Sequence, residues 1–171
     1  MLQLSSLKDL YFAQLQDLYS AETQLLQALP KMAQAASHDS LRASFEDHIE
    51  QTQTHIQRLE GIFSELGRSP GGHECEAMKG LVEEGEEIIE ADGDTNVKDA
   101  ALIAAAQRIE HYEIAGYGTV RTFAQHLGLD EHVQLLQTTL DEEGDTDKKL
   151  TLLAEGGVFA DGINEEAEAA V

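Results

Sequence analysis

Residues 96–126 read NVKDAALIAAAQRIEHYEIAGYGTVRTFAQH, and their pattern is the most informative in the chain about its fold. Its apolar side chains recur at steps of three and four, which is the spacing of one face of an α-helix. The face comprises Leu102, Ala106, Ile109, Glu113, Gly116, Val120 and Leu127, with Ile103, Glu110 and Tyr117 on the adjoining side. The stretch therefore predicts one long amphipathic helix that carries two glutamates toward its buried side.

Three other segments have the same period. They span about residues 5–36, 38–66 and 130–154, and each has an apolar stripe of helical spacing. Residues 67–94 form a long connection that contains a weaker helical stretch near 76–89. Sustained alternation of β-branched and polar residues is absent from the sequence, so we predict no β-strand.

Four amphipathic helices with one long connection predict an all-α, ferritin-like four-helix bundle. The first and second helices are joined tightly and should be antiparallel, and so should the third and fourth. The long crossover, with its short helix, then makes the second and third helices roughly parallel. We assign residues 1–155 to the bundle and residues 156–171 to an acidic, Gly/Ala-rich tail, which we expect to pack loosely.

The composition limits the classes of partner. Among 171 residues, 33 are acidic and 11 are basic, which gives a formal net charge of −22. Such a surface repels nucleic acids and anionic membranes, so neither is an expected partner. The sequence contains no apolar run of about 20 residues and no recognisable secretory signal, and its single cysteine rules out an internal disulfide. We therefore expect a cytoplasmic protein.

Each predicted buried stripe is apolar except near its middle. Helices rise about 1.5 Å per residue, so Glu22 lies roughly 22 Å along the bundle from Leu7. Counted along the other three helices, the same height falls near positions 51, 111 and 145. The polar side chains at this level are the candidate ligands Glu22, His48, Glu110, Glu113, Glu143 and Asp147, with Asp17, Gln51, Thr52 and His55 as neighbouring or substitute ligands.

Converging carboxylates are costly to bury unless they are protonated or balanced by cations. The stripes carry no inward-facing Lys or Arg at this level, so bound metal is one way to balance them. Carboxylates with imidazole suit iron or manganese, and we expect two ions per chain. A single metal, or none with a protonated hydrogen-bond network, is the alternative.

Several longer motifs carry a resemblance to a known family. They are Asp17-x-Tyr19-x-Ala21-Glu22-x-Gln24, Phe45-x-x-His48 with Thr52 and Arg58, residues 75–84, the block 99–119, and residues 139–150. On these residues the chain resembles the YciE/YciF-type stress proteins of the ferritin-like superfamily. The resemblance implies a bacterial cytoplasmic protein that forms a homodimer, is linked to stress responses, and holds a di-metal site of poorly defined reaction.

One departure from the wider superfamily limits what the resemblance implies. No histidine here has a glutamate three positions before it, so the superfamily's Glu-x-x-His signature is missing. Three functions stay open: an oxidoreductase acting on iron, peroxide or dioxygen, a metal-binding or storage protein without turnover, and a non-enzymatic dimeric helical scaffold with a degenerate metal site.

Overall fold

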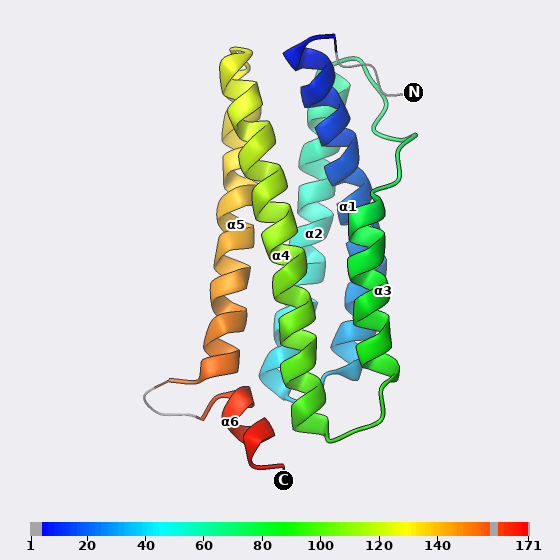
Figure 1. Cartoon of the computed structure of the whole chain (residues 1–171). Helices are drawn as coiled ribbons and strands as arrows, with labels where there is room; N and C mark the ends of the chain where they lie inside the picture. The colour runs from blue at the N-terminus through cyan, green and yellow to red at the C-terminus, as the bar shows by residue number, and fades with distance from the viewer. Residues whose placement is uncertain (1–4, 158–160, 171) are drawn as a thin grey trace.

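The computed structural model describes residues 5–157 and 161–170 (Figure 1). The first five helices of this part begin and end close to the predicted positions, and the sixth was not predicted. They are α1 (Leu7–Ala35), α2 (Asp39–Glu65), α3 (Glu76–Glu90), α4 (Thr95–His126), α5 (Asp130–Glu155) and α6 (Ile163–Glu168). None of the described helices is both long enough and apolar enough to cross a membrane.

The four long helices form the predicted bundle. α1 and α2 make one helical hairpin and α4 and α5 make the other, while α1 packs on α4 and α2 packs on α5 (Figure 1). α3 lies in the crossover and packs on the outside of α1 and α4. The prediction of an all-α, ferritin-like bundle with a helical crossover is therefore confirmed.

The core consists of two apolar clusters that are separated along the bundle. On α1, Leu18 belongs to one cluster and Leu25 to the other, with the buried Glu22 between them. On α2, Phe45 and Leu59 belong to different clusters in the same way. The polar side chains near the middle of each stripe thus form one layer, as the helix-height count predicts.

Two polar contacts fix the ends of the first hairpin. The Ser6 hydroxyl accepts a hydrogen bond from the Asp9 backbone N–H at 3.1 Å and so caps α1. The buried Asp99 carboxylate of α4 accepts hydrogen bonds from the backbone N–H groups of Ser37 and His38, at 2.9 and 2.7 Å. This second contact ties the α1–α2 turn to α4, and so sets the height of α2 against α4.

The expectation of a loosely packed tail does not hold for residues 161–170. α6 packs against α4 and α5, and Ile163 is only 2% exposed and belongs to an apolar core cluster. The apolar side chain that begins this short helix finds buried surface at the end of the bundle. The remaining tail positions, 158–160 and 171, lie outside the described residues.

Replacing Gly162 by Ala is expected to loosen α6. A Cβ at this position would lie 2.4 Å from the backbone oxygen of Ala154, and that backbone belongs to α5 and cannot easily move. We expect the variant to lose about 1–3 kcal/mol of unfolding free energy, measured by thermal denaturation. Gly157→Ala is the control, because a Cβ there meets no atom within 4 Å. Equal Tm values for the two variants would contradict the prediction.

Candidate metal centre

Four helices contribute ionisable side chains to the polar layer. α1 supplies one, α2 supplies two, α4 supplies two and α5 supplies one. Each has at most 2% of its surface exposed, although isolated charged groups are rarely so buried. These residues are Glu22, His48, His55, Glu110, Glu113 and Glu143. Spacings of three residues on α4 and seven on α2 keep the paired side chains on one helix face.

The six side chains form two groups that share one residue. In one group, His48, Glu110, Glu113 and Glu143 each offer a ligand atom, and all four atoms lie within 4.8 Å of one another. In the other group, Glu22, His55 and Glu143 do the same. Because Glu143 belongs to both, the two groups are adjacent and share one carboxylate.

The individual contacts agree with this division. His55 Nδ1 lies 3.0 Å from Glu143 Oε1 and 3.3 Å from Glu22 Oε1. His48 Nε2 lies 3.4 Å from Glu110 Oε1. The Tyr117 hydroxyl donates a hydrogen bond to Glu22 Oε1 and so fixes the orientation of that carboxylate.

Many polar atoms of the layer are buried without a hydrogen-bond partner. Both carboxylate oxygens of Glu113 and of Glu143 are of this kind, and His55 Nδ1 is too, because its close approach to Glu143 is not aligned for a hydrogen bond. The others in the layer are Glu22 Oε2, Glu110 Oε2, His48 Nε2 and Thr52 Oγ1. Such atoms normally find partners, and carboxylate oxygens and imidazole nitrogens are atoms that could bind a cation.

Burial and mutual repulsion shape the charges of the layer. Burial raises the pKa of Glu110 and of Glu113 well above the ordinary value, and the charge of Glu143 raises both further. Burial lowers the pKa of His48, which leaves its imidazole neutral and able to bind a metal. Burial also lowers the pKa of His55, but the Glu143 and Glu22 carboxylates outweigh it and raise that pKa to about 10. In the absence of a cation, the layer therefore retains protons.

The structure brings together five of the six residues predicted as ligands, together with His55, predicted as a neighbour or substitute. Thr52 is fully buried in the same layer. Gln51 lies at its edge, with Oε1 3.4 Å from His48 Nδ1 and accepting a hydrogen bond from Thr146 at 3.3 Å.

Asp147 and Asp17 lie outside both groups. Asp147 is one helical turn beyond Glu143, where its carboxylate accepts a hydrogen bond from Gln107 at 3.1 Å and lies 3.5 Å from His111. Asp17 accepts a hydrogen bond from the Tyr112 hydroxyl on the α3 side of the bundle. Both carboxylates thus have hydrogen-bond partners and partial exposure to water, whereas the buried Glu113 and Glu143 have neither.

Sequence reasoning missed one pair of residues at the edge of the layer. Glu142 Oε2 lies 3.0 Å from His55 Nε2, and Arg58 donates to Glu142 Oε1 at 2.9 Å and to Thr139 Oγ1 at 3.1 Å. The hydrogen bond from Arg58 holds the pKa of Glu142 below its usual range. The sequence does indicate part of this arrangement, because Arg58 is three positions after His55 and must lie on the same helix face.

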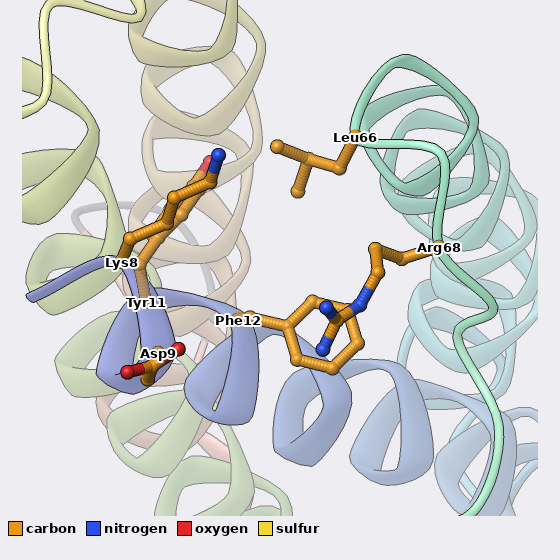
Figure 2. Close-up of a pocket in the computed structure, with 6 residues that line it drawn as sticks. All are labelled: Lys8, Asp9, Tyr11, Phe12, Leu66 and Arg68. Carbon is orange, nitrogen blue, oxygen red and sulfur yellow. The ribbon is translucent and has the colours of Figure 1, made fainter. Parts of the chain in front are cut away.

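A separate cavity lies at the end of the bundle where α1 begins and α2 ends (Figure 2). Its volume is about 160 Å³, and the Arg68 guanidinium lies over the Phe12 ring at 4.0 Å from the ring centre. Its lining is Lys8, Asp9, Tyr11, Phe12, Leu66 and Arg68. None of the candidate ligands lines this cavity, so it is not the centre described above.

A four-helix bundle with a buried layer of carboxylates and imidazoles defines a class of protein, the helical bundles that hold polar or metal sites between facing helices. Within that class, the chain belongs to the family described as "Domain of unknown function (DUF892)", which it matches over residues 6–167. The resemblance to the YciF-type stress proteins is thereby confirmed at the level of the family.

Individual relatives support the same assignment. The chain is 44% identical to Protein YciF of Escherichia coli K12 over 98% of both chains. The crystal structure of the E. coli stress protein YciF superposes with a TM-score of 0.84 over 86% of this chain and 94% of that one, at 46% identity. The structure of YcfI from Rhodopseudomonas palustris superposes with a TM-score of 0.85 over 89% of this chain and 97% of that one, at 41% identity.

Proposed function

We propose that the polar layer binds a pair of iron or manganese ions. One ion would be held by His48, Glu110 and Glu113, the other by Glu22 and His55, and both by Glu143. The observation that carries the proposal is the set of buried ligand atoms without hydrogen-bond partners, concentrated in two groups of the required size. Oxygen ligands with imidazole are the donor set that iron and manganese accept.

The chain's own residues prepare this site for redox chemistry. A bound pair of such ions supplies electron transfer with peroxide, dioxygen or ferrous iron. The apolar clusters on both sides of the layer exclude water, and Tyr117 orients Glu22. The E. coli relative is described as a stress protein, and iron oxidation or peroxide removal would fit such a role.

A second function is favoured by the uneven ligand set. The group that contains Glu22 offers three residues, one fewer than the other, and Asp147 is engaged elsewhere. A core of this kind also fits a dimeric helical scaffold with a degenerate metal site and no turnover. The homodimer and the cytoplasmic location stay predictions.

Metal content tests the proposal. Protein purified without chelator or nickel affinity resin, and analysed by inductively coupled plasma mass spectrometry, is expected to hold about two iron or manganese ions per chain. The metal-loaded protein is then assayed for ferrous-iron oxidation and peroxide consumption. Turnover supports the redox function, and full loading without turnover favours the scaffold. No bound metal after anaerobic reconstitution would contradict the metal centre.

A further inference from the structure

The bundle has four seams, and one of them differs from the others. α1–α2 and α4–α5 are the two tightly joined hairpins, and α3 covers the seam between α1 and α4 (Figure 1). α6 packs on α4 and α5. Within residues 5–157 and 161–170, no additional helix covers the α1–α2 seam or the α2–α5 seam, and of these two the α2–α5 seam is the one that no hairpin turn joins. Surface pockets between α2 and α5 open this seam to solvent.

Two adjacent cavities open along the α2–α5 seam. The larger has a volume of about 410 Å³ and is lined by Asp47, Glu50, Gln51, Thr54 and Glu142. The smaller, of about 140 Å³, shares two of these residues and adds others from both helices. Its lining is Ser44, Asp47, Gln51, Asp145, Thr146 and Lys149. The shared residues make the two cavities one continuous depression, which we call the α2–α5 depression.

Both histidines of the polar layer connect this depression to the ligand groups. His48 directs Nε2 toward Glu110 and Nδ1 toward Gln51, a residue that lines the depression. His55 directs Nδ1 toward the inner carboxylates and Nε2 toward Glu142, which also lines it. Each histidine therefore contacts both its ligand group and a residue that lines the depression.

The charge of the depression favours cations. Four carboxylates line it: Asp47, Glu50, Glu142 and Asp145. The cations beside them are Lys149, 2.7 Å from Asp47, Lys148, 2.9 Å from Asp145, and Arg58, which pairs with Glu142. Three cations against four carboxylates leave a net charge of −1, which raises the local concentration of cations and their rate of association. The cavity at the end of the bundle has the opposite character, with Lys8 and Arg68 against a single Asp9.

We infer that the α2–α5 depression is the access route by which divalent metal cations reach the core. In this route the Glu142 carboxylate binds an incoming cation before the cation moves to the buried ligands. The inference rests on the proposed metal centre. Glu142 is 31% exposed on its side chain and contacts the buried His55, so it faces both solvent and site. Arg58 acts as a positioning residue, because it must release Glu142 before an incoming cation can take its place.

The rate of Co²⁺ uptake tests the route. Metal-free full-length protein is mixed with Co²⁺ in a stopped-flow instrument, and the visible absorption of the bound ion is followed. Glu142→Gln is expected to slow uptake about tenfold at low ionic strength while the final absorption stays that of the wild type. Added salt should slow the wild type more than the variant. The matched control is Glu84→Gln, which removes the same charge from an exposed position of α3.

A second variant guards against indirect effects of freeing Arg58. Asp47 and Glu50 are exposed, so the double replacement Asp47→Asn/Glu50→Gln leaves the core intact and should also slow uptake. Wild-type rates in both variants, or equal slowing by Glu84→Gln, would overturn the route. A wild-type protein that takes up no Co²⁺ would instead overturn the metal centre itself, so the two failures are distinguishable.

Discussion

Replacement of Glu143 by Gln is expected to remove both metal ions from the core. Glu143 is the residue common to the two ligand groups, and both of its oxygens are buried without a hydrogen-bond partner. The amide keeps the volume of the side chain but lacks its charge. Loss of groups that merely orient a ligand costs 10–100-fold in affinity, so loss of a shared ligand should cost at least about 100-fold for each ion.

The comparison with Glu22→Gln makes this prediction specific. Glu22 belongs to one group alone, so that variant is expected to keep about one ion per chain. Asp141→Asn, an exposed replacement two positions before Glu143, should keep the wild-type content. Metal content by mass spectrometry and helicity by circular dichroism are measured together. Equal metal loss in the Glu143 and Glu22 variants, with helicity retained, would show that the two groups are not independent sites with a common ligand.

The fold and the level of the site follow from helical periodicity. A stripe of apolar residues at steps of three and four fixes which face of each helix is buried, and short connections fix which helices are antiparallel. Because helical rise is constant, positions such as Glu22 and Glu113 can be matched in height by counting. This reasoning predicted the polar layer because long regular helices leave few other arrangements.

The predictions about individual residues that were wrong or incomplete depend on the direction of single side chains and on contacts distant in sequence. Asp147 and Glu143 share a stripe, yet one turn of helix places Asp147 beside Gln107, where it has a polar partner at the surface. Glu142 lies just off the stripe, but its side chain still reaches His55 at the open seam. The packing of Ile163 against the bundle involves a contact distant in sequence, which periodicity within one helix does not report.

Replacement of Glu113 by Gln is expected to have opposite effects on the metal-free and metal-loaded proteins. Glu113 is fully buried, both of its oxygens lack partners, and burial followed by the charges of Glu22 and Glu143 raises its pKa well above the ordinary value. The amide has nearly the same shape and carries no charge. At pH 8 the metal-free variant should therefore gain about 1–3 kcal/mol of unfolding free energy, while its affinity for metal falls.

The raised pKa of Glu113 also predicts how the unfolding free energy of the metal-free protein changes with pH. The pKa of the Glu113 carboxyl is higher in the folded state than in the unfolded state, where it has its ordinary value of 4.5. The carboxyl therefore contributes its full stabilisation below pH 4.5, where it is protonated in both states. That contribution is lost as the pH rises from there through the raised pKa. The unfolding free energy of the metal-free wild type should fall over this range, and Glu113→Gln should fall less steeply. Bound metal should remove the difference in slope, because the ion then competes with the proton for the same oxygens.

Denaturant unfolding of chelator-treated protein at several pH values measures both slopes, with Glu84→Gln as a control that removes one exposed charge. That control corrects for the general self-repulsion of a chain with a net charge of −22. A Glu113 variant less stable than the wild type at pH 8 without metal would mean that the carboxylate has a stabilising partner within the protein. In that case the buried carboxylates would form a hydrogen-bond network of their own, and the need for a cation in the core would disappear.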